Sequence, residues 1–246
     1  IRNKLILNAF ILAVTTVLAG FSFYIVKSKD GSIFKAPLVF AGAYLFSITI
    51  IHILPELFSE AEEPFNLGIV LLAGFFLQHF LEYLTSGVEH GHIHHSENNH
   101  QHKNSSTISL LIALCIHALL EGALLSHPSS HHHQHESNTI LFGIVLHKMP
   151  AAFALISIIS FQFKKKTVPL VSLFIFSLMS PLGMILSDLI DFKSNYVNYI
   201  FALVGGSFLH ISTTIFVESN PGHKTDFKKI GLLLLGVAAA LLVELL

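Results

Sequence analysis

The chain has a single cysteine, Cys115, and few charged side chains among its 246 residues. One cysteine excludes an internal disulfide framework and a metal cluster built on thiolates. Charged residues make up 12% of the chain and hydrophobic residues 52%, which is too apolar for an ordinary soluble domain. The net charge of −1 argues against nucleic acid as a partner. We therefore expect an integral membrane protein in contact with lipid.

Eight apolar runs are long enough to cross the ~30 Å hydrocarbon core of a bilayer. They lie near residues 5–26, 36–58, 66–86, 107–126, 138–160, 167–190, 196–217 and 228–246. The first run follows two basic residues as a signal peptide would, yet it is ~22 residues long and shows no small-residue cleavage site. We expect it to be a retained span. The predicted fold is all-α and polytopic, with eight transmembrane helices.

Basic residues are unevenly distributed over the segments between these runs. If the spans alternate in direction, one side of the membrane holds ten basic residues: Lys27, Lys29, Lys35, Lys103, Lys164, Lys165, Lys166, Lys224, Lys228 and Lys229. The other side holds only Arg2, Lys4 and Lys193, and Lys148 lies inside a span. Because basic loops stay in the cytosol, both termini are predicted to be extracytoplasmic.

Two loops are rich in histidine. The predicted cytosolic loop, 87–106, contains His90, His92, His94, His95, His100 and His102. The predicted extracytoplasmic loop, 127–137, contains His127, His131, His132, His133 and His135. Such tracts suit weak, exchangeable capture of borderline metals, with the candidate loop site at His92, His94 and His95. The alternative, solvated loops whose histidines do nothing specific, stays open.

The segment His117-Ala-Leu-Leu-Glu121 places an imidazole and a carboxylate in the fourth apolar run. At i and i+4 on a helix they share one face, with ~6 Å of rise between them. A charge at the bilayer centre costs roughly 2.5–3.5 kcal/mol, so these groups are expected to line a polar path. With His147 from the fifth run they offer the nitrogen and oxygen donors that Zn²⁺ and neighbouring ions accept. The alternative is a hydrogen-bonded link between helices.

Lys148 follows His147, and Ala151 lies one helical turn further on. A buried ammonium at this position is expected to neutralise Glu121 and to take the place of a second metal ion without being transported. Snorkelling of the lysine toward an interface is the weaker alternative, because its position is mid-span.

Proline and glycine interrupt two of the apolar runs. The fifth contains Gly143 and Pro150, and the sixth contains Ser180-Pro-Leu-Gly183. Proline removes a backbone donor and frees a carbonyl on the preceding turn, which membranes tolerate where protein or a water-lined path satisfies the freed group. Ser180 is therefore a candidate additional ligand, and plain kinks are an equally good explanation.

Two further His/Glu pairs lie toward the ends of spans. His52 and Glu56 are at i and i+4 in the second run and are candidates for an entrance site. His210 and Glu218 in the seventh run are candidates for an exit site. Interfacial capping or helix packing is the alternative for all four.

The third apolar run contains one more pair of this kind. His79 and Glu82 lie three residues apart and so on one face of a helix. We expect these two side chains to have a structural role.

The chain resembles the ZIP (Zrt-/Irt-like) family of divalent metal transporters over essentially its whole length. Gly42 to Glu56 is similar to the family pattern Gly-x-x-Phe-Leu-x-x-x-x-x-His-Leu-Leu-Pro-Glu. His117 to Gly122 is similar to His-Ser-x-x-Glu-Gly, His147-Lys148 to the fifth-span His-Lys, and Ser180 to Gly183 to Ser-Pro-Leu-Gly. The histidine-rich loop after the third span also fits.

The resemblance implies one transporter domain over 1–246, with eight helices, outward termini and zinc as the usual cargo. It carries the ligand role to His117, Glu121 and His147. Family members with a binuclear site have an acidic residue one turn after the fifth-span histidine and an acidic or amide group beside it. Ala151 and Lys148 stand in those places here.

The resemblance therefore favours a single-metal site, similar to that of the branch typified by animal plasma-membrane importers. Ala118 replaces an Asn or Ser that is common beside the fourth-span histidine. Ser180, water or another residue is then needed to complete the coordination.

We expect uptake of Zn²⁺ toward the cytosol, without a cofactor and without enzymatic activity. Fe²⁺, Mn²⁺ and Cd²⁺ are alternative cargoes, the membrane is a plasma membrane or a bacterial inner membrane, and a homodimer stays open. One rival is a zinc-dependent intramembrane hydrolase, in which the same ligands activate water. The sequence lacks the HExxH motif of such enzymes. The second rival is a metal sensor or storage protein that uses the histidine-rich loops alone.

Overall fold

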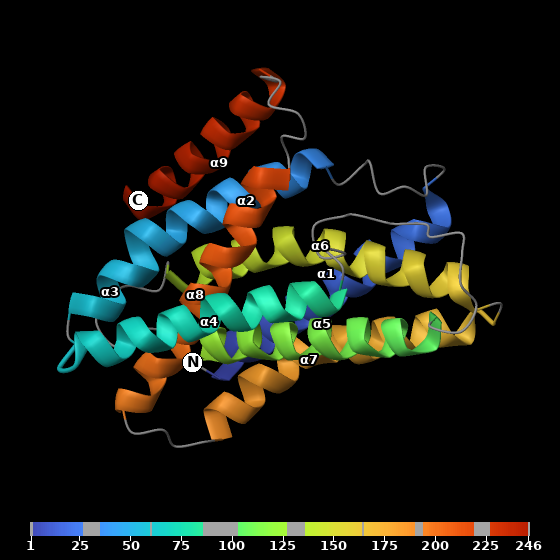
Figure 1. The fold of residues 1–246 in the computed structure, drawn as a ribbon, viewed down its shortest axis with the longest axis horizontal. Coiled ribbons are helices and arrows are strands. Elements are labelled where there is room, and N and C mark those ends of the chain that lie inside the picture. The colour runs from blue at the N-terminus through green and yellow to red at the C-terminus, as the bar shows by residue number, and fades with distance from the viewer. Residues whose placement is uncertain are drawn as a thin grey trace.

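The computed structural model describes residues 2–26, 35–59, 61–85, 103–126, 136–163, 165–189, 194–218 and 227–245. Every regular element within these ranges is a helix (Figure 1). The helices are α1 (Arg2–Ile25), α2 (Lys35–Ile48), the π-helical turn η2 (Thr49–Ile53), α3 (Leu54–Ser59), α4 (Pro64–Thr85), α5 (Lys103–Ser126), α6 (Glu136–Gln162), α7 (Thr167–Leu189), α8 (Ser194–Glu218) and α9 (Phe227–Leu245). The candidate loop site His92, His94 and His95 lies outside the described residues.

Each predicted apolar run coincides with a helix, and α2, η2 and α3 together form the second. Six helical segments of the described chain are long and apolar enough to cross a membrane: Asn3–Ile25, Ala36–Ser59, Pro64–Leu84, Thr107–Ser126, Thr139–Gln162 and Thr167–Asp188. Helices suit this environment because all their backbone hydrogen bonds form within one segment. The chain is therefore a multi-pass, all-helical membrane protein.

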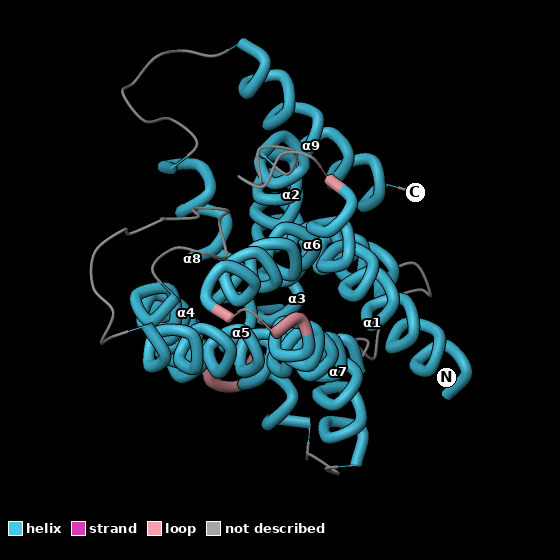
Figure 2. The backbone as a smooth tube through the Cα atoms, turned by 90° about the vertical axis from the view of Figure 1, so that its right-hand side faces the viewer, coloured by secondary structure: helices cyan, strands magenta, loops and turns pink. Residues whose placement is uncertain are grey.

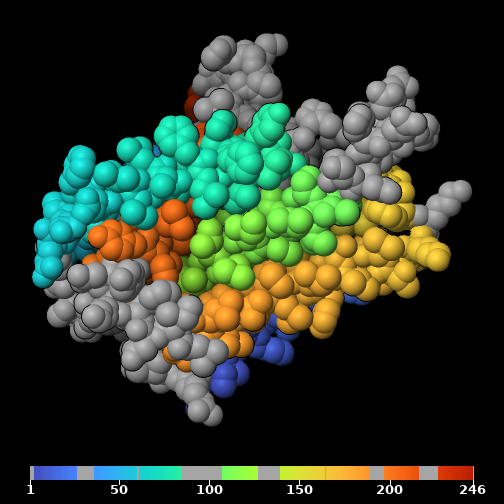
Figure 3. Space-filling view, turned by 60° about the horizontal axis from the view of Figure 1, so that its bottom comes forward, coloured from blue at the N-terminus to red at the C-terminus, as the bar shows by residue number. Residues whose placement is uncertain are grey.

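Large apolar side chains are exposed along the outer helices. Phe10 of α1, Phe76 of α4, Phe174 of α7 and Leu235 of α9 are each at least 60% exposed. Figure 3 shows one such face, on which α4, α5 and α7 lie side by side. An apolar surface of this extent would be unstable in water, and lipid chains cover it without cost.

The helices fall into two groups by their packing (Figure 2). One group consists of α1, α5, α6 and α7, and the other of α2, α4, α8 and α9. The two groups meet mainly where α2 packs on α6 and α4 packs on α5. The packing within each group is more extensive than the packing between the two groups.

The tightest helix pair in each group is brought together by glycine. In the first group, a Cβ on Gly122 of α5 would collide with the carbonyl of Ser180 in α7, and one on Gly183 of α7 with that of Leu119. Small residues at such crossings let membrane helices approach closely. The pattern Ser180-Pro-Leu-Gly183 therefore packs α7 onto α5.

The prolines have different effects on the helices that contain them. Pro150 and Pro181 lie inside the continuous helices α6 and α7. Pro55, by contrast, is the second residue after the π-helical turn, where the Leu54 N–H donates to the Thr49 carbonyl five residues back. Because Pro55 has no N–H, it cannot form the usual helical hydrogen bond to the carbonyl of residue 51, and the helix widens here. This turn holds His52.

The α4–α8 pair offers a matched test of close packing. A Cβ at Gly74 would collide with the backbone carbonyl of Leu203, whereas one at Gly68 of the same helix meets nothing within 4 Å. We expect Gly74→Ala to lower the melting temperature in detergent, since overpacking costs about 1–3 kcal/mol. Gly68→Ala should leave it unchanged or raised, because alanine favours helix. Equal melting temperatures for the two variants would contradict this packing.

Candidate metal site

The two histidines and the glutamate singled out in the fourth and fifth runs converge between α5 and α6. His117 and Glu121 from α5 and His147 from α6 are each no more than 3% exposed. One ligand atom from each lies within 4.8 Å of the other two. The His117 Nε2 is 3.0 Å from the Glu121 Oε1, and the two imidazole rings are perpendicular with centroids 5.5 Å apart. Two nitrogens and one oxygen therefore face a common point.

Lys148 reaches the same carboxylate from the other side. Its Nζ donates to the Glu121 Oε2 at 2.9 Å and to the Ser180 Oγ at 2.8 Å. It also lies 4.7 Å from the centre of the Phe176 ring, within the range of a cation–π interaction. The two oxygens of Glu121 thus have separate partners, His117 on one side and the lysine on the other.

Ser180, the candidate additional ligand, forms a hydrogen bond with Lys148. Its hydroxyl donates to the Ala118 carbonyl at 2.7 Å and accepts from the Lys148 Nζ. The close approach of α7 at Gly122 is what places this hydroxyl beside α5. The serine predicted as an additional ligand therefore acts, in this arrangement, on the lysine that neutralises Glu121.

The ion pair is a demanding arrangement in a membrane interior. Removing a carboxylate and an ammonium from water costs several kcal/mol per ion, and their attraction offsets this only with good geometry and further hydrogen bonds. Glu121 and Lys148 are 1% and 3% exposed, and both make several short polar contacts. The pair places one negative charge beside two imidazoles while keeping the formal charge of the pair at zero.

The candidate entrance residues make the contact that the sequence suggested, and His52 makes a further one. His52 approaches Glu56 at 3.7 Å, but its Nδ1 lies only 3.1 Å from the Glu244 Oε2 in α9. Sequence reasoning missed Glu244, because the contact joins residues 192 positions apart. The available signal was a carboxylate in the last apolar run, Glu244, with no basic residue near it in the sequence.

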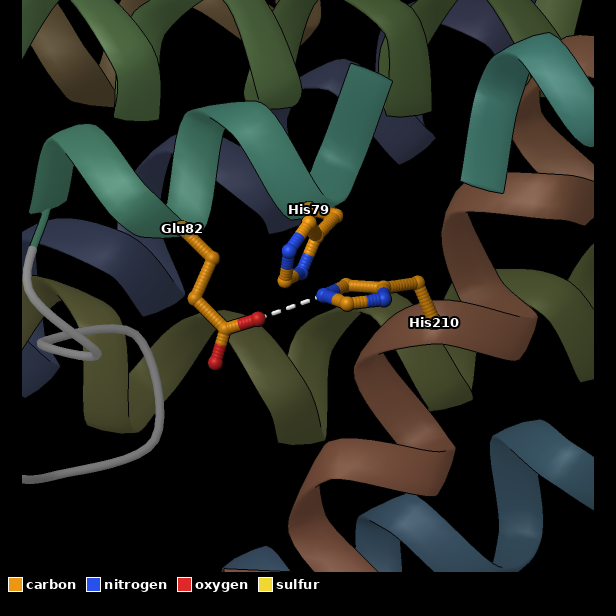
Figure 4. Close-up of side chains that lie close together, drawn as sticks. All are labelled: His79, Glu82 and His210. Atoms are coloured by element: carbon orange, nitrogen blue, oxygen red, sulfur yellow. Dashed lines mark hydrogen bonds and ion pairs between the residues drawn. The ribbon is translucent and has the colours of Figure 1, made fainter. Parts of the chain in front are cut away.

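The candidate exit residue His210 also has a partner that sequence reasoning did not assign. Its Nε2 contacts the Glu82 Oε2 of α4, and the His79 ring lies beside it with centroids 5.2 Å apart (Figure 4). The Glu218 side chain lies outside the described part of the chain. His79 and Glu82, expected to be structural, thus form a second His/His/Glu group with His210.

Fold and site together define a class of protein, a multi-pass helical membrane protein with buried metal-ligand residues between its spans. The model of the family described as ZIP zinc transporter matches residues 87–244. This match includes α5, α6 and α7 and most of the chain, so the protein belongs to the ZIP family. No curated protein matches the chain. Family membership supports transport of divalent metal ions, zinc above all. It also confirms the resemblance at the level of the family.

The Glu121–Lys148 pair predicts a double-mutant cycle in stability. Glu121→Gln and Lys148→Met each leave the opposite charge buried without its partner, so each should cost about 3–5 kcal/mol of unfolding free energy. The double variant should lose clearly less than the sum of the two. The measurement is thermal unfolding in detergent without metal. Lys166→Met, at an exposed lysine, is the control, and additive losses in the cycle would contradict the coupling.

Proposed function

We propose that this protein carries Zn²⁺ across a membrane toward the cytosol through a single-metal site made by His117, Glu121 and His147. The supporting observation is that three buried ligand atoms from two helices lie within 4.8 Å of one another. Two imidazoles favour borderline ions, and the carboxylate supplies the charge that makes dehydration of the ion tolerable. Fe²⁺, Mn²⁺ and Cd²⁺ share enough of this chemistry to be alternative cargoes.

Lys148 takes the place of a second metal ion in this proposal. Its ammonium lies on the oxygen of Glu121 that does not face His117. An ion bound by the three ligands therefore shares the carboxylate with the lysine, which weakens binding and favours release. Reversible binding is what a transported ion requires. With Ala151 one turn after His147, the site is closest in kind to the His-Lys branch of the family.

The domain spans 1–246 in this proposal, with α8 and α9 crossing the membrane as the seventh and eighth spans. Helix directions support the alternation. Gln78 of α4 contacts Ser207 of α8, and further along both helices Glu82 contacts His210. The two helices therefore run in the same direction, as spans three and seven should. Both termini then lie outside, and the loops 87–106 and 127–137 capture metal on opposite sides.

Zinc flux into proteoliposomes that hold an internal zinc dye tests the site. His117→Ala and Glu121→Ala should abolish flux, because each removes one of three ligands and Glu121→Ala also leaves Lys148 unpaired. A variant with the loop histidines of 87–106 and 127–137 changed to asparagine should keep most of it. Flux that survives in both span variants would sink the proposed site. Flux lost only in the loop variant would favour a protein that works through its loops.

Cysteine labelling tests the eight spans and their orientation. In a Cys115→Ala background, an impermeant maleimide applied to intact cells should label Ile1→Cys and Leu246→Cys. It should label Asn98→Cys and Asn220→Cys only after permeabilisation, because these loops are predicted to be cytosolic. Labelling of Asn220→Cys and Leu246→Cys from the same side would show that α9 does not cross the membrane.

A further inference from the structure

We propose that His79, Glu82 and His210 form a second divalent-metal site, between α4 and α8 and separate from the transport site. One ligand atom from each of the three lies within 4.8 Å of the other two. Two imidazole nitrogens and one carboxylate oxygen make up the set, as they do between α5 and α6. The metal it would take is Zn²⁺ or a neighbouring ion that accepts nitrogen and oxygen ligands.

The side chains already point toward a common centre (Figure 4). The His210 Nε2 contacts the Glu82 Oε2, and the His79 ring stands beside His210 at 5.2 Å between centroids and 73° between planes. Ligand atoms that share one tetrahedral zinc lie roughly 3.3 Å apart. Small rotations of the side chains would bring these atoms from their present spacing to that geometry. Phe75 holds the His210 ring edge-on at 4.8 Å.

The helix pair that carries the group does not need the group to hold it together. The backbones of α4 and α8 are already close, since a Cβ at Gly206 would collide with the carbonyl of Leu71. One turn before the group, the buried Ser207 hydroxyl donates to the Gln78 Oε1 at 2.9 Å. A buried hydrogen bond and close packing at glycine therefore set how α4 packs on α8 independently of the contact between Glu82 and His210.

His210 is buried and faces the group with one ring nitrogen. The residue is 5% exposed. Its Nε2 faces the carboxylate of Glu82 and the His79 ring. The ring thus presents one nitrogen to a shared space and is held there by packing.

The group lies nearer the surface of the protein than the proposed transport site does. His79 is exposed and Glu82 partly exposed, whereas His117, Glu121 and His147 are all buried. Glu82 lies three residues before the end of α4 at Thr85, about 4.5 Å along the axis. The chain continues from there into the histidine-biased loop 87–106. An ion at this position would lie near the end of α4.

The two clusters lie in different helix groups, one in α5 and α6 and the other in α4 and α8. The role of the second site rests on the proposed function, because it would receive the ion that leaves His117, Glu121 and His147 on the cytosolic side. Its existence as a metal site does not rest on that function. Binding at each site is therefore measured separately.

Equilibrium dialysis of the full-length chain in detergent against Zn²⁺ tests the proposal. The background carries asparagine in place of the loop histidines of 87–106 and 127–137, and it should bind two ions per chain. His79→Ala should remove one ion, with its affinity weakened at least ~100-fold, since even loss of a group behind a ligand costs 10–100-fold. Phe80→Ala, at an exposed neighbour on the same helix, is the matched control and should bind two.

His79 is exposed, so its replacement should not impair folding, and His210→Ala should give the same loss. The tetrahedral Co²⁺ absorption of each variant gives a second readout. Unchanged zinc binding in both His79→Ala and His210→Ala would overturn the second site and leave Glu82 and His210 as a link between helices. If His117→Ala removes no ion while His79→Ala does, the transport site fails and the second site stands.

Discussion

The ion pair between Glu121 and Lys148 is the constraint on which the rest of the structure depends. A carboxylate buried alone between membrane helices would be unstable, and a lysine 2.9 Å away offsets much of that cost. The lysine in turn needs partners of its own, which Ser180 and Phe176 of α7 supply. Helix α7 can supply them only because Gly122 lets it approach α5 so closely.

The two clusters of ionisable side chains lie in different helix groups. The group of α1, α5, α6 and α7 contains the ion pair and its imidazoles, and the group of α2, α4, α8 and α9 contains a second His/His/Glu cluster. Each group has its own glycine-packed helix pair and its own buried polar contacts. A division of this kind suits a family whose members move metal, since movement between the groups would change the surroundings of an ion without dismantling either cluster.

Sequence reasoning reached the helices and the shared face of His117 and Glu121, because both follow from local rules, while the part of His147 was implied by the family resemblance. Apolar runs of membrane length predict spans, and the i, i+4 spacing predicts that His117 and Glu121 share a face. Contacts set by helix crossings were out of reach. The contacts of Ser180 depend on where α7 meets α5, and the contact of His210 with Glu82 depends on how α4 packs on α8. Neither crossing follows from the residues of a single helix.

Anomalous diffraction at the zinc absorption edge, from crystals of the full chain grown with zinc, tests the central claim most directly. The account predicts a single peak where the ligand atoms of His117, Glu121 and His147 converge, with the Lys148 ammonium still on the other oxygen of Glu121. Two peaks at that point, with the lysine displaced, would contradict a single-metal site. Absence of a peak there in zinc-saturated crystals would contradict the site itself.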